Sequence, residues 1–275
     1  MEQLAGKVAV VTGAGSGIGK GLAERFVAEG MNVVLADIDE VRLRLVESEL
    51  SESGGNVLPV VCDTSLEESV QALAQRALDH YGAAHVLCNN AGVVGKGDPW
   101  TGPMAVWDWV VGINLYGVIH GIRAFLPIMT EQGEGHIVNT ASMAGLLAMP
   151  GAAPYNVTKH GVVALSEGLF TELKGTGSRV GVSVLCPGYV RTELMKKMAW
   201  AERLGDEPPP TANPVGQVVD QMLRDGIEDG MPPSEVAAHV VAAIKADRFW
   251  ILTHPDFGPT VTERYRKAVA QENPV

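Results

Sequence analysis

The sequence has few cysteines, few aromatic side chains and few positive charges. Its 275 residues include 3 cysteines and 5% aromatic residues, and 21 Lys and Arg stand against 32 Asp and Glu, for a formal net charge of -11. A surface with this excess of acid produces no basic field to attract the phosphates of nucleic acid or an anionic membrane. We therefore expect neither nucleic acid nor a membrane as a partner.

The cysteines are Cys62, Cys88 and Cys186, and each ends a short apolar run. No CxxC pair or His-rich spacing accompanies them, so we expect small buried residues in strands and no metal site. An odd number of cysteines also fits a reducing compartment. The first thirteen residues, Met1–Gly13, have an acid at position two and only a short apolar run. They resemble neither a signal peptide nor a membrane span, and no later segment has the apolar length for one without charges or turn residues, so we expect a cytoplasmic protein.

Short apolar, β-branched runs do recur along the chain, and their length is that of strands. Most are separated by amphipathic segments of helical length, such as Leu66–Gly82, which follows Thr64-Ser65 and ends on a glycine. The alternation predicts one α/β domain over residues 1–275, with a doubly wound, Rossmann-like and mostly parallel sheet covered by helices on both faces. The seven strand candidates are Lys7–Thr12, Asn32–Asp37, Asn56–Val61, His85–Asn89, His136–Ala141, Val180–Cys186 and Phe249–Thr253.

One interval, about 189–233, contains no strand candidate and holds the run "PPP" at residues 208–210. A structureless loop of this length is unusual in a compact domain, so we expect one or two short helices there. The alternative is a disordered insertion. The interval leaves a strand at its carboxyl end, where open α/β sheets bind ligands, and this position favours a lid over the substrate.

A glycine-rich turn follows the first strand candidate, in the stretch "TGAGSGIGKG". The frame G-x-G-x-x-G fails, because counting from Gly13 places Ile18 at its last position. The frame T-G-x-x-x-G-x-G fits, with Gly13, Gly17 and Gly19. Glycines between a strand and a helix let the backbone approach a pyrophosphate at the positive end of the helix dipole.

Asp37 ends the second strand candidate, at the position where a dinucleotide fold has an acid that binds the hydroxyls of the adenosine ribose. A carboxylate about 4 Å from a 2′-phosphate repels it by about 4 kcal/mol per unit charge at an effective dielectric constant of about 20. Neither Ser16 nor Ile38 offers a basic side chain in compensation. The sequence therefore favours NAD over NADP.

Tyr155 and Lys159 lie four positions apart in the helix-like stretch "APYNVTKHG", so their side chains share one helix face. Oxidation of an alcohol needs a base for the hydroxyl proton, and a tyrosine of ordinary pKa, about 10, is protonated at neutral pH. We expect the ammonium of Lys159 and the positive charge of an oxidised nicotinamide to depress the pKa of Tyr155 by about two to three units. Ser142, at the end of the fifth strand candidate, could bind the substrate oxygen opposite the phenol.

These motifs occur in the order and spread of the short-chain dehydrogenase/reductase family, which the sequence resembles in its compact single-domain branch. The matching features are "TGAGSGIG", "CDTS", "NNAG", Asn114, Ser142, Tyr155 with Lys159, and "PGYVRT". The resemblance implies a nicotinamide-dependent alcohol oxidation or carbonyl reduction, with Ser142, Tyr155, Lys159 and Asn114 as the catalytic group. It also implies that Lys159 holds the nicotinamide ribose and that Asn114 holds a water linking Lys159 to solvent. The cofactor-binding set is Gly13, Ser16, Gly17, Ile18, Gly19, Asp37, Ile38, Asp63, Thr64, Asn90, Ala91, Gly92, Tyr155, Lys159, Pro187, Gly188, Val190 and Thr192.

The stretches around this group are apolar and rich in methionine, which suits a bulky or variable apolar ligand. We expect a secondary alcohol or ketone of steroid-like, terpenoid or aryl type. The predicted substrate contacts are Ser142, Tyr155, Val94, Leu146, Met149, Tyr189, Leu194 and Met195, with Val93, Met143, Leu147 and Met198 nearby.

Two alternatives remain at this point. One is an NADPH-dependent ketoreductase of the β-ketoacyl-carrier-protein reductase type, and the other is a non-catalytic dinucleotide-binding or sensing protein. We interpret Trp107 and Trp109 as core or subunit-contact residues. Family resemblance further implies a homotetramer or homodimer built on the helices around Met104–Met129 and Tyr155–Lys174.

Overall fold

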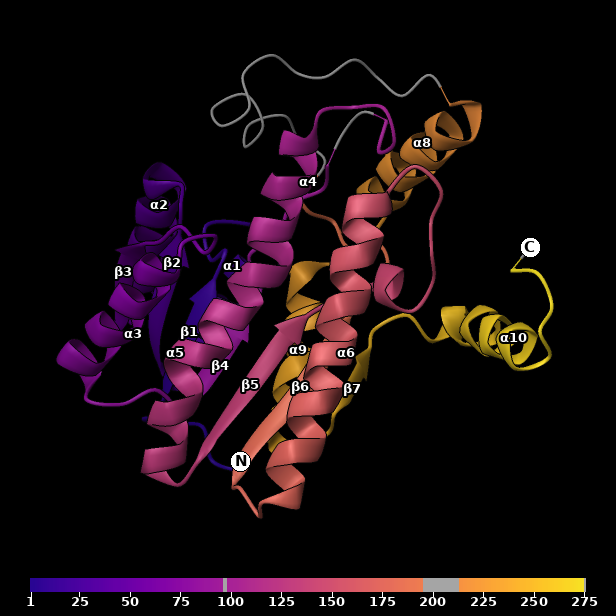
Figure 1. The fold of residues 1–275 in the computed structure, drawn as a ribbon. Coiled ribbons are helices and arrows are strands. Elements are labelled where there is room, and N and C mark those ends of the chain that lie inside the picture. The colour runs from indigo at the N-terminus through magenta and orange to yellow at the C-terminus, as the bar shows by residue number, and fades with distance from the viewer. Residues whose placement is uncertain (96–97, 195–212, 275) are drawn as a thin grey trace.

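Seven parallel strands form one sheet in the computed structural model, which describes residues 1–95, 98–194 and 213–274. The strand order is β3-β2-β1-β4-β5-β6-β7, and helices cover both faces (Figure 1). The predicted fold class is confirmed, and no strand end differs from its predicted position by more than one residue. The strands are β1 (Val8–Thr12), β2 (Asn32–Asp37), β3 (Val57–Val61), β4 (Val86–Asn89), β5 (Gly135–Thr140), β6 (Val180–Cys186) and β7 (Trp250–Leu252).

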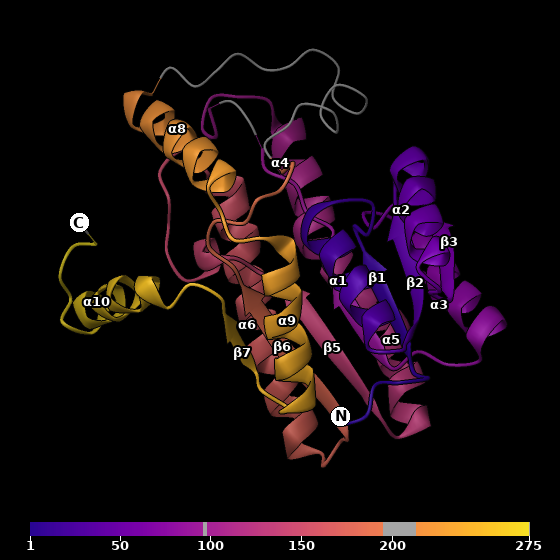
Figure 2. The ribbon, with the colours of Figure 1, turned by 180° about the vertical axis from the view of Figure 1, so that it is seen from behind.

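The central strands are apolar on both faces because helices bury both. Every residue of β1, β4, β5 and β6 is buried. One core contains side chains of α1 (Gly17–Ala28), α2 (Glu40–Glu52) and α9 (Pro233–Lys245), and the second contains side chains of α3 (Glu67–Tyr81), α5 (Gly117–Gln132) and α6 (Ala153–Gly175). Figures 1 and 2 show the two layers from opposite sides. The three cysteines are free and buried; Cys88 and Cys186 lie in strands, as predicted, whereas Cys62 directly follows β3.

Helix α3 begins at Glu67, after Leu66 as its N-cap, and ends before Gly82, which has φ 75°. The helix therefore starts two residues after Thr64-Ser65, neither of which is its N-cap, and it ends at the predicted glycine. A left-handed residue after a helix is a position that glycine adopts without steric cost.

A helical stretch runs through α4 (Met104–Val111), a π-helical turn η1 (Gly112–Tyr116) and α5. By length and composition this stretch, Met104–Gln132, could cross a membrane. It contains Asp108, Arg123 and three glycines, so the expectation that no segment has the apolar length without charges or turn residues still holds. Its α5 part buries Val118, Ile122, Phe125 and Met129 against the sheet. A helix of this kind, apolar on a buried stripe, is also typical of the core of a soluble domain.

The interval 189–233 contains a parallel bridge between Val190 and Met231 and one long helix, α8 (Pro214–Glu228). Residues 195–212, including the "PPP" run, lie outside the described residues. The lid remains a prediction. After β7 the chain makes a short turn, η3 (Pro255–Phe257), and ends in α10 (Gly258–Val269), which projects from the body beyond β7 (Figures 1 and 2).

Candidate active site

A cavity of about 1000 Å³ lies at the carboxyl ends of the central strands. It extends from the loops after β1, β2 and β3, past the loops after β4, β5 and β6, to α8 and α10. Parallel strands open their carboxyl ends onto one edge of the sheet, and ligands of doubly wound folds bind there. About 1000 Å³ is the upper end of the range for ligand pockets, and it suits a large cofactor with a substrate beside it.

The glycine loop forms one end of the cavity. Gly13 and Gly17 have φ of 67° and 51°, and a Cβ on Gly13 would lie 2.9 Å from Cα of Ala91. Gly13, Ser16, Gly17 and Ile18 line the cavity. Gly19, which was also predicted to bind the cofactor, does not line the cavity. A Cβ on Gly19 would lie 1.9 Å from the carbonyl oxygen of Gly13, so a glycine here lets α1 pack closely on the loop.

Asp37 lines the same end of the cavity, together with Ile38. Its Oδ2 accepts a hydrogen bond from the backbone N–H of Gly15 at 2.8 Å, and its Oδ1 accepts one from Asp39 at 3.0 Å. A Cβ on Gly15 would lie 2.9 Å from Oδ2, so glycine is needed for this approach. The backbone thus fixes the carboxylate where the sequence predicts it.

The loop after β4 is tied to β1 through Thr12. The hydroxyl of Thr12 accepts hydrogen bonds from the backbone N–H groups of Asn90 at 2.9 Å and Ala91 at 3.1 Å, and the Asn90 amide donates to the Thr12 carbonyl at 3.0 Å. Asn90, Ala91 and Gly92 line the cavity, and so do Asp63 and Thr64 after β3. The residues present therefore fit a dinucleotide, because the glycine-rich turn, the Asp37 carboxylate and the loop after β4, which is held by Thr12, line one end of the same cavity.

Ser142, Tyr155 and Lys159 meet in the middle of the cavity, from the loop after β5 and from α6. The ammonium nitrogen of Lys159 lies 5.5 Å from the centre of the Tyr155 ring and donates to the Thr140 carbonyl at 2.9 Å. The Ser142 hydroxyl accepts from the N–H of Ala144 at 3.1 Å. Lys159 is buried and Tyr155 is half-buried, so both side chains are held in fixed positions.

The expected depression of the tyrosine pKa is not what the protein alone produces. Burial raises the pKa of Tyr155 above its ordinary value, and a hydrogen bond with the Ser142 side chain opposes this only in part. Burial also lowers the pKa of Lys159 from 10.5 to about 8. Desolvation disfavours the charged form of each group, and it is the largest cause of both shifts here. The phenol consequently keeps its proton unless a further positive charge is brought beside it.

Asn114 lies in the π-helical turn η1 and is fully buried. Its amide makes two 2.8 Å hydrogen bonds with the backbone of Val93, accepting from the N–H and donating to the carbonyl. It does not line the cavity, and its hydrogen bonds position the loop after β4, so its place in the catalytic group stays a prediction. The water implied by family resemblance stays a prediction.

The segment after β6 lines the cavity with Pro187, Gly188, Val190 and Thr192, all predicted for the cofactor. The N–H of Gly188 donates to Nδ1 of His254 at 3.1 Å, which holds this loop against the turn after β7. The sequence shows neither metal spacing nor a nucleophile partner for His254, which predicts a structural or surface residue, and this contact agrees with a structural role.

Most predicted substrate contacts line the cavity: Val94, Met149, Tyr189 and Leu194, with Val93, Met143 and Leu147. Leu146 was predicted wrongly, because its side chain is 5% exposed and packs in the core, and Leu147 is the leucine that lines the cavity. Met195 and Met198 lie outside the described residues.

Several lining residues were missed by sequence reasoning. Trp109 lines the cavity and is not confined to a core or subunit contact, while Trp107 donates to the Pro99 carbonyl. Helix α8 contributes Val219, Met222, Leu223 and Ile227, whose spacing is an apolar helical stripe that could have been found. The residues missed in η3 and α10 are Phe257, Pro259, Thr260, Glu263, Arg264 and Lys267, and no local pattern marks them.

Comparison with known proteins agrees with this geometry. The family model "short chain dehydrogenase" matches residues 7–203. The chain is 31% identical over 277 residues to a CLA biosynthesis dehydrogenase/reductase of Lactiplantibacillus plantarum, covering 100% of this chain and 97% of the relative. It is 35% identical over 253 residues to a 1-deoxy-11-beta-hydroxypentalenate dehydrogenase of Streptomyces exfoliatus, covering 91% and 84%. The crystal structure of a short chain dehydrogenase/reductase from Burkholderia phymatum in complex with NAD matches with a TM-score of 0.92 and 42% identity, covering 100% of this chain and 98% of that one. The chain therefore belongs to the short-chain dehydrogenase/reductase family of oxidoreductases.

Proposed function

We propose that the protein transfers hydride between NAD(H) and a bulky apolar secondary alcohol or the corresponding ketone. The observation that carries the proposal is the convergence of Ser142, Tyr155 and Lys159 in one cavity, with an apolar wall on one side and the Asp37 carboxylate on the other.

Asp37 supports NAD over NADP. Two backbone N–H groups hold its carboxylate at the cavity wall, so it cannot turn away from a 2′-phosphate without losing both hydrogen bonds. The observation that favours the NADPH-dependent alternative is Arg42, whose Cβ lies close to Gly15. Its guanidinium, however, pairs with Asp39 at 3.2 Å and Glu193 at 3.1 Å, so two carboxylates already balance its charge.

The chain's own residues suit proton transfer to and from the substrate oxygen. The bound nicotinamide would supply or accept the hydride. Tyr155, protonated because of its burial, would donate a proton to the oxygen of a ketone, and Ser142 would hold that oxygen by a hydrogen bond. In the opposite direction Tyr155 must lose its proton, and the positive charge of Lys159 favours the phenolate form. Lys159, buried and bonded to the Thr140 carbonyl, also lies where a ribose could be held.

Two measurements test the proposal. Initial rates with NADH and NADPH at equal concentrations, on a panel of apolar ketones, should favour NADH, and a clear preference for NADPH would reject the cofactor assignment. Tyr155→Phe keeps the shape of the ring and removes the hydroxyl, so turnover should fall by about 10²- to 10⁴-fold, the range for loss of general acid-base catalysis. Unchanged turnover in Tyr155→Phe would favour a different mechanism, and absence of turnover in both proteins would favour the non-catalytic dinucleotide-binding alternative.

We also propose a cytoplasmic homotetramer or homodimer. Support comes from apolar side chains exposed on the predicted contact helices, among them Met104, Tyr116 and Val157, which are 67%, 53% and 54% exposed. Light scattering on the purified protein tests the assembly, and a monomer at micromolar concentration would contradict it.

A further inference from the structure

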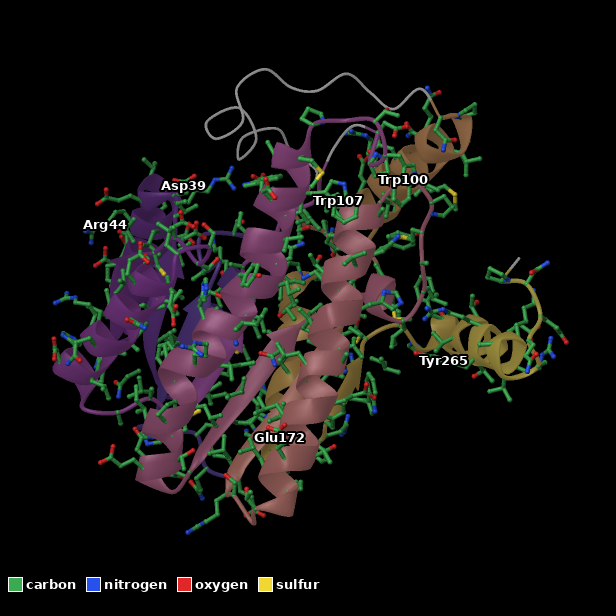
Figure 3. All side chains as sticks on the ribbon, in the orientation of Figure 1. Asp39, Arg44, Trp100, Trp107, Glu172 and Tyr265 are labelled. Atoms are coloured by element: carbon green, nitrogen blue, oxygen red, sulfur yellow. The ribbon has the colours of Figure 1, made fainter. Side chains whose placement is uncertain are left out.

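Two basic side chains lie at the end of the cavity away from the nucleotide loop. Arg264 and Lys267 both line the cavity and are both half-buried. They are three residues apart on α10, so they share one side of that helix. In Figure 3 their neighbour Tyr265 marks α10 on the opposite side of the molecule from Asp39, which begins α2 beside the nucleotide end.

Arg264 and Lys267 form no ion pair with an acid among the described residues. Glu263, the acid beside them on α10, makes a two-pronged ion pair with Arg266 at 2.7 and 2.9 Å, and Arg266 also pairs with Glu272. The pKa of Glu263 is lowered mainly by Arg266, and Lys267 adds to this through space without forming an ion pair. The Lys267 side chain makes no hydrogen bond or ion pair with the part of the chain that is described. Arg264 makes one hydrogen bond, from Nη1 to the Leu146 carbonyl, and its guanidinium lies 5.4 Å from the Tyr265 ring centre. These contacts hold the guanidinium in place and leave most of its donors for a ligand.

A positive site at this position is notable because the wall between it and the catalytic group is apolar. Met149, Leu223, Ile227 and Phe257, from the loop after β5, α8 and η3, line the cavity that holds both groups. An apolar body would cover this wall, and a negative group at its far end would meet two cations. Arginine and lysine bind carboxylates through charge-assisted hydrogen bonds, which are stronger than those between neutral groups.

We propose that α10 forms a carboxylate-binding end of the substrate pocket, and that the substrate is an apolar hydroxy acid or keto acid. Its carboxylate lies at Arg264 and Lys267 while its alcohol or ketone lies at Ser142 and Tyr155. This inference rests on the proposed function, because it names the substrate class of the same site. The carboxylate takes no part in the redox step. Glu193 and Glu263 also line the cavity, so a singly charged carboxylate is favoured over a doubly charged phosphate ester.

The first experiment compares an acid with its neutral ester. The rate of NAD reduction is measured for 9-hydroxydecanoate and for methyl 9-hydroxydecanoate in the wild type, Lys267→Gln, Arg264→Gln and the double variant. We expect the acid to have a kcat/KM about tenfold or more above that of the ester. This advantage should fall several-fold in each single variant, disappear in the double variant, and shrink with added salt. Lys267→Gln breaks no hydrogen bond or ion pair within the described chain, so it tests charge apart from folding.

The matched control is Arg224→Gln, on the exposed face of α8, which removes one positive charge from an ion pair with Asp220 and does not line the cavity. It should retain the acid-to-ester ratio of the wild type. An acid and ester of equal kcat/KM, or an advantage that survives in the double variant, would overturn the inference.

A binding measurement separates this inference from the proposed function. Calorimetry on the NAD-loaded protein compares decanoate with decanamide, neither of which can be oxidised at a secondary alcohol. Tighter binding of decanoate that is lost in the double variant supports the carboxylate site even if no alcohol is turned over. Equal binding of the two overturns it even if Tyr155→Phe behaves as proposed.

Discussion

His136 should make the protein less stable in mild acid by an amount that can be calculated. This histidine lies in β5, is 1% exposed, and places Nε2 2.7 Å from the hydroxyl of Ser183. That hydroxyl donates to the Arg248 carbonyl at 2.6 Å, so Nε2 is the nitrogen that carries the hydrogen in the neutral ring. Burial lowers the pKa of His136 from 6.5 to about 4, and the carboxylate of Asp247 opposes the shift only in part.

The direction of the change in stability with pH follows from the pKa values of His136 in the unfolded and the folded protein. Below about pH 6.5 the unfolded chain binds a proton at His136, whereas the folded protein does so only near pH 4. Acidification therefore favours unfolding, and the stability contributed by the neutral histidine is lost as the pH falls from 6.5 to about 4. Proton linkage gives a loss of about 2 kcal/mol between pH 7 and pH 5, approaching about 3 kcal/mol below pH 4.

The assay is urea unfolding at fixed protein concentration, followed by tryptophan fluorescence at about pH 7, 6 and 5. His136→Gln removes the titrating group, so its unfolding free energy should fall about 2 kcal/mol less than that of the wild type over this range. Other groups, such as His85, Glu29 and Glu134, have lowered pKa values and respond to acid in both proteins, so only the difference is informative. His239→Gln, at an exposed position on α9, should follow the wild type. Parallel curves for wild type and His136→Gln would refute the reasoning.

Three further outcomes are expected. Asp37→Ser removes a repulsion of up to about 4 kcal/mol, so the ratio of kcat/KM for NADH to that for NADPH should fall at least about tenfold; an unchanged ratio would assign the preference to other residues. Gly19→Ala places a Cβ 1.9 Å from the Gly13 carbonyl oxygen and should weaken NAD binding strongly in calorimetry. The control, Gly168→Ala, is at a helical position with nothing within 4 Å of the added Cβ, so it should raise the free energy of unfolding by about 0.5–1 kcal/mol and leave NAD binding intact. Leu146→Ala should lower the unfolding free energy by about 2–5 kcal/mol, and Leu147→Ala should mainly raise the KM for an apolar substrate; the reverse pattern would contradict their placement.

The parts of the site that lie within one element were predictable from the sequence. Tyr155 and Lys159 share a helix and a face because they are four residues apart, and the turn at Gly13–Gly19 joins a strand to a helix within a few residues. Asp37 ends a strand, which places it at the carboxyl edge of any parallel sheet. In each case chain geometry over a short distance determines the position of the side chain.

Other parts of the site could not be predicted from neighbouring residues in the sequence. Leu146 and Leu147 are adjacent in the sequence, and only the packing of the turn after β5 decides that the first enters the core and the second the cavity. Asn114 carries no local sign that its amide is taken up by Val93, a residue 21 positions away. The pKa of Tyr155 depends on how much water surrounds the phenol, which no spacing of residues reveals.

The sequence by itself determined the parallel sheet, the glycine-rich turn after β1, the position of Asp37 at the end of β2 and the Tyr155–Lys159 pair, because periodicity, glycine conformation and helix geometry act over a few residues. Only the tertiary structure decided which apolar side chains face the substrate and that α10 brings Arg264 and Lys267 to the far end of the cavity. It also decided that burial dominates the charge states of Tyr155 and Lys159. Burial and long-range contact depend on segments that are distant in the chain, so they exist only once the chain has folded.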